Sequence, residues 1–509
     1  MTFDLSIPSQ LSTALAPDLL LFAGAMVLML VAAWRPDSAA HQRTVGLASL
    51  GLCVLVLVAC VAIAGQGWSA GNGVVAVDAF RWSSNVVFLL AAIITIALSV
   101  EYNAREGIVM GEAHVLVVFA TGGMMLMAAA RDLMVLFLGI ELMSVAVYVL
   151  AGLNRRSNRS AEAALKYFLL GAFSTGFLLY GIALVYGATG STNLATIGER
   201  IATMNLAQSP MLLVGVALLL VGFGFKLAAA PFHMWAPDVY EGAPTPITGY
   251  MAAGVKAAAF AAFLRVWLEA FPAVYGEWHR AVWWLAAITM IVGNVVALQQ
   301  RNLKRMLAYS SIGHTGFILV ALAAGTPQAA TAFIFYLVAY TLATMGAFAV
   351  MVALGTAAQP RETMEDYHGL WHERPGMAVA MAVFMLALLG FPIFGGMGFF
   401  AKWYVLQAAL QAPAPQTRLA VILVIATSIS AGYYLALVMA MFMKPRPAGA
   451  QALPPTGGIV RAVIVASVAI ILVFGAWPEP LVKLVQRGST MGAPPGAPAA
   501  PAAQTATSR

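Results

Sequence analysis

Long apolar runs dominate this 509-residue sequence and constrain its fold more than any other feature. Windows of about 20 apolar residues, long enough to cross a ~30 Å hydrocarbon core, begin near residues 17, 44, 77, 112, 132, 164, 208, 246, 281, 303, 329, 377, 417 and 459. Only 9% of the residues are charged, whereas soluble domains carry roughly 25%. The pattern predicts an all-α membrane protein with about 14 transmembrane helices.

The loops between these predicted spans differ in charge. If the N-terminus faces away from the cytoplasm, the cytoplasmic loops hold Arg35, Arg43, Arg105, Arg155, Arg156, Arg159, Arg301, Lys304, Arg305, Arg361, Arg374, Lys444, Arg446 and Arg461. The opposite loops hold only Arg131, Arg200, Arg280 and Arg418. Because Lys and Arg concentrate on the cytoplasmic side, we expect a multi-pass membrane protein with both termini outside the cytoplasm.

The remaining charge pattern excludes two other classes. The first basic residue is Arg35, so a cleaved secretion signal is not expected and the first apolar run should remain a span. The net charge of +7 is scattered and forms no basic stripe interleaved with aromatic residues, so we expect no nucleic-acid partner.

A short repeated motif predicts internal symmetry. Residues 131–134 (RDLM) open the fifth span and residues 301–304 (RNLK) open the tenth, and in this topology they begin on opposite sides of the membrane. This indicates two inverted five-helix repeats, spans 4–8 within residues 112–272 and spans 9–13 within 281–442. Spans 1–3 occupy residues 1–111, span 14 occupies 459–485, and the low-complexity segment 489–509 is expected to be a disordered tail.

Prolines and glycines predict breaks in two spans. Pro231 follows Lys226 in GFGFKLAAAPFHMW and cannot donate a hydrogen bond to the carbonyl of Leu227, so span 7 should break there. Pro392 and the glycines of FPIFGGMGFFAK should break span 12. Backbone groups released at such breaks favour ion handling.

Four of the charged residues within the predicted spans are the main candidates. A charge at the bilayer centre costs about 2.5–3.5 kcal/mol on insertion scales, so each is a candidate functional residue. Glu141 lies ~15 Å along its helix from Arg131, Lys226 adjoins the first break, Lys256 is flanked by alanine and glycine, and Lys402 follows the second break. For each residue, helix packing or snorkelling is the structural alternative.

Three further residues are weaker candidates for a proton relay. Lys166 follows Glu162 by four residues and could form an ordinary helix-surface ion pair. His314 lies near the middle of its span and His233 beside Pro231, and either could instead satisfy a hydrogen bond in the core.

Other residue types predict no site of their own. Arg265 and Glu269 are spaced as an i, i+4 pair near a span end and are not candidates. Cys53 and Cys60 are separated by about 10 Å along one helix, too far for a disulfide. The sequence shows no phosphate loop and no zinc, haem or iron–sulfur spacing, so no cofactor or metal is expected in this chain.

The segments ALKYFLLGAFSTGFLLYGIALVYGATGST and GFGFKLAAAPFHMWAPDVYEGAPTPITGYMAAGVKAAAF resemble the antiporter-like membrane subunits of respiratory complex I, the proton-translocating NADH:quinone oxidoreductase. The resemblance covers nearly the whole chain. Within the family it is greatest to the N-type subunits, the counterparts of mitochondrial subunit two. The chain is expected to end soon after span 14, without a lateral helix, and Lys402 stands where the M-type subunits carry a glutamate.

This resemblance implies roles for individual residues. Glu141 and Lys226 match the family's ion pair, Lys256 its central relay and Lys402 its exit-side residue, while Lys166 matches a further family lysine. It also implies that NADH, FMN, iron–sulfur clusters and quinone bind other subunits. The expected partners are the other membrane and peripheral subunits, including a neighbouring antiporter-like chain, and membrane lipids.

The residues by themselves leave three alternatives open. A subunit of a multisubunit sodium/proton antiporter would share the buried lysines. An independent solute transporter could also use broken helices and inverted repeats. The chain could also be a scaffold for neighbouring subunits that transports nothing.

Overall fold

The structure is a computed structural model that describes residues 12–65, 73–357, 359–412, 414–447 and 452–491. Within these ranges the regular structure is helical, with three isolated β-bridges and no strand. Twelve helices of the described residues are long and apolar enough to cross a membrane. The all-α membrane fold is therefore confirmed, whereas the predicted tail lies mostly outside the described residues.

Ten of these membrane-length segments are single helices. They are α2 (Ala16–Trp34), α3 (Ala39–Ala64), α4 (Ala79–Arg105), α5 (Glu112–Ala129), α6 (Leu133–Ala151), α7 (Asn158–Thr189), α14 (Leu303–Ala324), α15 (Pro327–Leu354), α19 (Thr417–Met443) and α20 (Gly458–Ala476). The other two segments are composite. The first consists of α11 (Thr245–Tyr250), a π-helical turn (Met251–Val255) and α12 (Lys256–Ala270). The second consists of a 3₁₀ turn (Pro272–Val274) and α13 (Tyr275–Ala297).

Two shorter apolar helices occupy the windows in which breaks are predicted. They are α9 (Pro210–Lys226), followed by α10 (Ala236–Gly242), and α17 (Pro375–Leu389), followed by α18 (Gly396–Leu410). Short connecting or terminal helices are α8 (Leu194–Thr203), α16 (Leu370–Glu373) and α21 (Glu479–Gly488).

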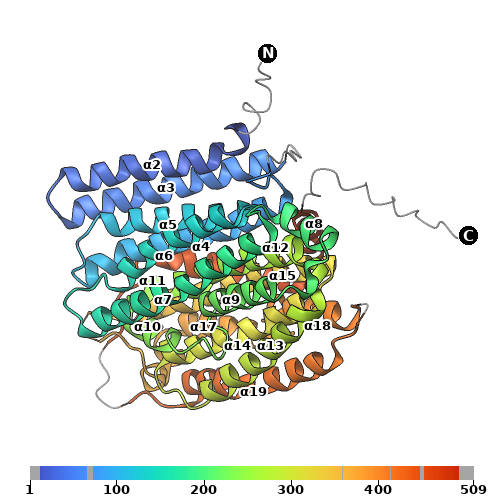
Figure 1. Ribbon diagram of the computed structural model, residues 1–509. Coiled ribbons are helices and arrows are strands. Elements are labelled where there is room, and N and C mark those ends of the chain that lie inside the picture. The colour runs from blue at the N-terminus through green and yellow to red at the C-terminus, as the bar shows by residue number, and fades with distance from the viewer. Residues whose placement is uncertain (1–11, 66–72, 358, 413, 448–451, 492–509) are drawn as a thin grey trace, which may run out of the picture.

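The helices pack side by side in one bundle. In Figure 1, α2 and α3 lie along one edge and α13 and α19 along the opposite edge. The central segments that contain α12, α14 and α15 are 94% buried over their apolar windows, whereas the window of α20 is only 22% buried. Outer helices keep large apolar side chains exposed, which is favourable only where lipid or another subunit covers them.

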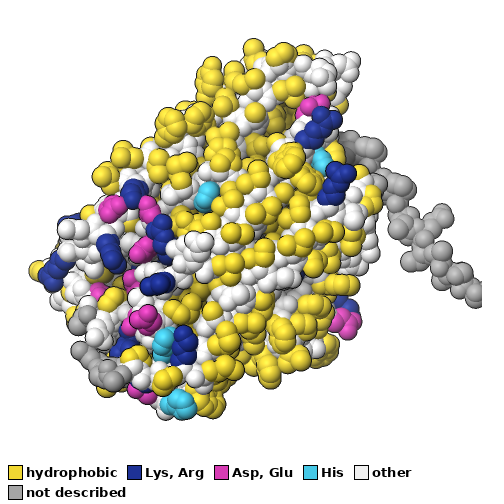
Figure 2. Space-filling model, turned by 90° about the horizontal axis from the view of Figure 1, so that it is seen from below, with side chains coloured by type: hydrophobic (Ala, Val, Ile, Leu, Met, Phe, Trp, Pro, Cys, Tyr) yellow, Lys and Arg dark blue, Asp and Glu magenta, His cyan; other side chains and the backbone are white. Residues whose placement is uncertain are grey.

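Charge on the visible surface is unevenly distributed. Figure 2 shows most of the visible Lys, Arg, Asp and Glu side chains at one end of the face viewed from below, a broad apolar band beside them, and a few charged side chains at the opposite edge. The start of α7 and the charged helix α10 lie at this end of the bundle (Figure 1). A belt of apolar surface flanked by charge is the arrangement expected for a protein surrounded by a bilayer.

The break after α9 occurs where Pro231 predicts it. The helix ends at Lys226, and Ala228 adopts φ 53°, a left-handed conformation that an alanine rarely adopts. The carbonyl of Leu227 accepts a hydrogen bond from the Thr315 hydroxyl at 2.9 Å instead of one from residue 231. A side chain from another helix therefore satisfies the backbone group that the proline leaves free.

The second break separates α17 from α18 at residues 390–395. Gly390 adopts φ 77° and ends α17 in the left-handed conformation that glycine tolerates best. At Gly398 a β-carbon would overlap the carbonyl oxygen of Ala387, so only glycine permits this close approach. The predicted interruption by Pro392 and its neighbouring glycines is confirmed.

The two copies of the repeated motif have the same local structure. Asp132 caps α6 and forms a bridge with Asn193, and Asn302 caps α14 and forms a bridge with Thr363. Both bridges join the start of a long helix to a segment that lies after the next long helix.

Candidate functional site

Lys226 is buried at the end of α9, with only 5% of its surface exposed. Its ammonium donates to the Ser144 hydroxyl at 2.7 Å and lies 3.4 Å from the Tyr148 hydroxyl, both on α6. It also lies 5.7 Å from the centre of the Tyr148 ring. The amine is therefore solvated by two hydroxyl groups and the face of an aromatic ring.

Glu141 differs from the expectation, because it is only partly buried. Its carboxylate accepts a hydrogen bond from Thr175 of α7 at 2.9 Å. It forms no ion pair with Lys226, because their charged atoms lie more than 4.0 Å apart. Glu141 is therefore less buried than the three lysines, and the direct ion pair with Lys226 that the resemblance implies is not formed in this structure.

The position of Glu141 around its helix explains this difference. Leu138 and Val145 are 58% and 56% exposed, and helical spacing places Glu141 beside them on an outward stripe of α6. The spacing from Arg131 predicts how far along the helix axis Glu141 lies. It did not give the direction in which the side chain points.

Lys256 begins α12 and is 2% exposed. Its ammonium donates to the backbone carbonyl of Ser311 on α14 at 2.9 Å and also contacts the Ser311 hydroxyl. That hydroxyl accepts a further hydrogen bond from Tyr340 of α15 at 2.8 Å. Lys256 therefore reaches across to the second half of the chain.

His314 lies on α14 next to this contact. Its Nδ1 is 2.6 Å from the Tyr336 hydroxyl, and its Nε2 is 3.1 Å from the Tyr434 hydroxyl. A cavity of about 10 Å³ is lined by His314, Tyr336, Tyr340 and Lys402, among others. This volume is close to the least that admits one water molecule, roughly 10–15 Å³.

Lys402 is buried on α18, with 7% of its surface exposed. Its ammonium donates to the carbonyl of Leu389, the last residue of α17, at 2.8 Å and lies 4.6 Å from the centre of the Phe317 ring. A cation at a helix C-terminus is stabilised by the helix dipole, so Lys402 also holds the second break together.

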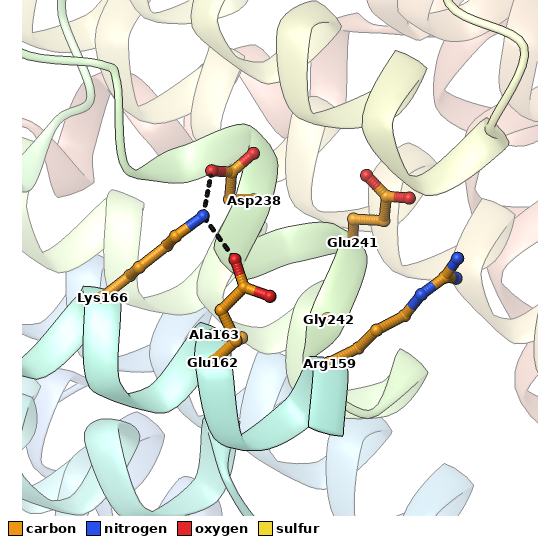
Figure 3. Close-up of a pocket in the computed structure, with 7 residues that line it drawn as sticks. All are labelled: Arg159, Glu162, Ala163, Lys166, Asp238, Glu241 and Gly242. Atoms are coloured by element: carbon orange, nitrogen blue, oxygen red, sulfur yellow. Dashed lines mark hydrogen bonds and ion pairs between the residues drawn. The ribbon is translucent and has the colours of Figure 1, made fainter. Parts of the chain in front are cut away.

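Lys166 lies at the edge of the bundle in a charged cluster around a cavity of about 160 Å³ (Figure 3). Its ammonium contacts Glu162 at 2.6 Å, as the i, i+4 spacing predicts, and Asp238 of α10 at 2.7 Å. Arg305 of α14 contacts the other oxygen of Asp238 at 2.7 Å and Glu241 at 3.1 Å. Asp238 therefore joins helices from both halves of the chain.

Asp238 lies outside the helices that are long enough to span the membrane. Its pKa lies below the usual value of an aspartate. Burial raises the pKa, but the hydrogen bonds and positive charges of Lys166 and Arg305 outweigh burial and lower it.

His233 lies in the break between α9 and α10 and is partly exposed. Among the described residues, no hydrogen bond or ring contact joins it to Lys226, Lys256 or Lys402. The structure thus brings His314, but not His233, into contact with the residues around the lysines.

Hydroxyl side chains bind the lysines and the groups next to them, and none of these side chains was predicted from the sequence. They are Ser144, Tyr148, Thr175, Ser311, Thr315, Tyr336, Tyr340 and Tyr434. A detectable signal was present in α14, where serine, histidine and threonine recur within two turns of an apolar helix. Such residues are costly in a membrane unless they have hydrogen-bond partners.

A second group of buried charges is fully paired. The guanidinium of Arg265 makes two hydrogen bonds to Asp78, at 2.8 and 2.9 Å, and a third to Glu269 at 2.8 Å. Glu269 also accepts from Arg131 at 3.0 Å. The i, i+4 pair set aside in the sequence is therefore part of a larger ion cluster that joins α4 to α12.

No group of three or more His, Cys, Asp or Glu side chains within the described part of the chain is placed to hold a metal ion. Cys53 and Cys60 are both buried free thiols.

Comparisons with known proteins identify the family. Residues 130–430 match the family model described as NADH:quinone oxidoreductase/Mrp antiporter, TM. A relative from Gemmatimonas aurantiaca named NADH-quinone oxidoreductase subunit N is 53% identical, covering 96% of this chain and 95% of that protein. A protein of the same name from Trichlorobacter lovleyi is 46% identical, with 92% and 95% covered.

Solved structures agree with this assignment. A chain of respiratory complex I from Thermus thermophilus is 36% identical with a TM-score of 0.77, covering 92% of this chain and 99% of that one. A chain of the Mrp complex from Dietzia is 21% identical with a TM-score of 0.81, covering 94% and 97%, and it shares the fold. The chain belongs to the subunit N family of NADH-quinone oxidoreductase, the antiporter-like membrane subunits of that enzyme.

Proposed function

We propose that this chain moves protons across the membrane through Lys226, Lys256 and Lys402, driven by electron transfer from NADH to quinone in other subunits. Lys166 and its charged cluster form the entry side, His314 bridges Lys256 and Lys402, and Glu141 modulates Lys226 from the outer face. His233 is proposed as a further residue of the proton relay, because it lies in the break between α9 and α10.

One observation carries this proposal. Lys226, Lys256 and Lys402 are each buried, and in the described part of the chain none has a carboxylate within 4.0 Å. Hydroxyl and carbonyl oxygens hold all three amines. Because burial disfavours a charge that no opposite charge compensates, such an amine can pass its proton on.

A nearby carboxylate provides a means of control. At an effective dielectric constant near 20, a carboxylate ~4 Å from an amine contributes about 4 kcal/mol, enough to decide whether the amine keeps its proton. Because Glu141 is partly exposed and hydrogen-bonded to Thr175, a neighbouring subunit that contacts α6 and α7 could move it towards or away from Lys226.

The proposed topology has fourteen spans, with span 7 formed by α9 and broken after it, and span 12 formed by α17 and α18. The matching caps and bridges at Asp132 and Asn302 support two inverted repeats. The division at residues 1–111, 112–272, 281–442 and 459–485 follows from this symmetry. We place the chain in a bacterial inner membrane, and the excess of Lys and Arg in the proposed cytoplasmic loops supports periplasmic termini.

The proposed partners are the other membrane and peripheral subunits of the enzyme, including a neighbouring antiporter-like chain, and lipids on the remaining apolar surface. FMN, iron–sulfur clusters, NADH and quinone would bind those other subunits. A role in a multisubunit sodium/proton antiporter is less well supported, because the relatives that cover almost all of the chain are named subunit N.

Replacing Lys226 by alanine tests this function. In sealed vesicles containing the assembled enzyme, Lys226→Ala should lower the number of protons moved per NADH oxidised. Lys483→Ala removes a lysine that is 67% exposed on α21 and should leave this number unchanged. A Lys226→Ala enzyme that assembles and pumps with wild-type yield would contradict the proposed relay.

A further inference from the structure

The Thr315 hydroxyl lies between the first helix break and the Lys256 contact. It is 2.9 Å from the carbonyl oxygen of Leu227 in the break and 3.2 Å from the carbonyl oxygen of Ser311 on its own helix. A threonine hydroxyl has one proton to donate. Thr315 can therefore bind fully to only one of these two carbonyls at a time.

The Ser311 carbonyl already has other donors. It accepts from the ammonium of Lys256 at 2.9 Å, and within α14 it is also the normal partner of the backbone amide four residues later. A carbonyl oxygen has two lone pairs. While Lys256 occupies this site, the Thr315 proton is directed to Leu227, the shorter of its two contacts.

The Leu227 carbonyl is the position through which such a change would reach Lys226. Leu227 follows Lys226 directly and precedes Ala228, whose φ of 53° needs support from its surroundings. A second anchor holds the same segment, because the Thr289 hydroxyl of α13 accepts from the amide of Ala230 at 2.9 Å. Both anchors come from helices in the second half of the chain.

We propose that Thr315 is a positioning residue that couples the proton state of Lys256 to the conformation of the break beside Lys226. When Lys256 is charged and bound to Ser311, Thr315 holds the Leu227 carbonyl. When Lys256 loses its proton and leaves Ser311, Thr315 turns to the Ser311 carbonyl and releases the break. This inference rests on the proposed proton relay and adds a link between two of its sites.

The chain offers a matched control. Thr95 on α4 is fully buried, as Thr315 is, and it makes the same type of bond to the carbonyl four residues earlier, at 2.7 Å to Ala91. Within the described part of the chain, its hydroxyl makes no hydrogen bond to the lysines or to either break. Thr95→Val therefore removes an equivalent hydroxyl from the apolar interior without touching the proposed link.

The test measures proton yield per NADH oxidised in vesicles and hydrogen exchange of the amides at residues 228–230, using the whole enzyme. Thr315→Val should lower the yield and speed exchange at the break about fivefold, the change that corresponds to ~1 kcal/mol for one lost hydrogen bond. Thr315→Ser should restore both values, and Thr95→Val should change neither. In a Lys256→Met enzyme, Thr315→Val should have a smaller additional effect on exchange, because the coupling is already lost.

The inference is wrong if the Thr315→Val enzyme shows the same proton yield as the Thr95→Val enzyme and the same amide exchange at residues 228–230. If the valine variant does not assemble, Thr315→Ala is judged by the same criteria, because it lacks the hydroxyl and adds no bulk. Normal pumping by Lys226→Ala and Lys256→Met would instead refute the proposed function itself. Loss of pumping in those two variants, together with normal pumping in Thr315→Val, would refute only the coupling.

Discussion

Three buried lysines, Lys226, Lys256 and Lys402, lie in the same apolar interior as the buried arginines but are stabilised in a different way. Arg265 is held by Asp78 and Glu269, so its positive charge is balanced by neighbouring carboxylates. Lys226 and Lys256 are held by hydroxyl and carbonyl oxygens. Arginine keeps its proton at any physiological pH, whereas lysine can lose its proton when buried.

Whether a buried cation has a carboxylate partner distinguishes structural from functional charges better than its degree of burial does. The arginine cluster joins α4, α12 and the start of α6, and each guanidinium in it is bound to a carboxylate. The lysines can exist in either form without leaving a carboxylate unpaired. Four predictions test the comparison, starting with the largest expected effect.

Arg265→Met should destabilise the protein by about 3–5 kcal/mol, because it leaves Asp78 buried without its main partner. The measurement is the midpoint of thermal unfolding of the purified enzyme, together with the amount assembled in membranes. The double variant Arg265→Met with Asp78→Leu should lose less stability than Arg265→Met alone. Wild-type stability of the single variant would show that the cluster is not a structural clamp.

Lys256→Met should assemble but lose most of its proton pumping. Removing an amine without a carboxylate partner leaves only Ser311 short of hydrogen bonds, which should cost no more than about 1–3 kcal/mol. Proton uptake and NADH oxidation are measured on the same vesicles. If Lys256→Met enzyme still pumps protons, or loses as much stability as Arg265→Met enzyme, the distinction between unpaired lysines and paired arginines is wrong.

Glu141→Gln should lower pumping less than Lys256→Met does and leave stability almost unchanged. The amide oxygen can still accept from Thr175, so the change removes the charge and retains the local contact. Thr175→Val serves as the control, because it removes the hydrogen bond and keeps the charge. A larger effect of Thr175→Val than of Glu141→Gln would mean that packing, and not charge, is what matters at this site.

Asp238→Asn should have the smallest effect, and the effect should depend on pH. Because the folded pKa of Asp238 is lowered, its ion pairs stabilise the protein above the ordinary aspartate pKa of about 3.9. This stability is lost as the pH falls through the folded pKa. Each such partly exposed pair contributes about 0.2–1 kcal/mol.

The measurement is the thermal midpoint of wild-type and Asp238→Asn enzyme across pH 3–7. The two midpoints should differ at neutral pH and converge at the acidic end. A difference that persists unchanged to the lowest pH would show that the carboxylate charge is not the cause.

The sequence by itself determined the membrane fold, the positions of the apolar helices and both breaks. These features depend on hydrophobicity, on the missing amide of proline and on the conformational range of glycine, all of which are local properties. It also identified Lys226, Lys256 and Lys402, because a charge within an apolar run is visible without any knowledge of its neighbours.

Only the tertiary structure decided what those charges contact. Residues 82 positions apart in the sequence meet in the hydrogen bond between Lys226 and Ser144, and residues 88 apart meet where Thr315 holds Leu227. It also placed Glu141 on an outer face and joined Arg265 to Asp78. Such contacts depend on the rotation and packing of whole helices, which the hydrophobic pattern of an almost uniformly apolar helix does not specify.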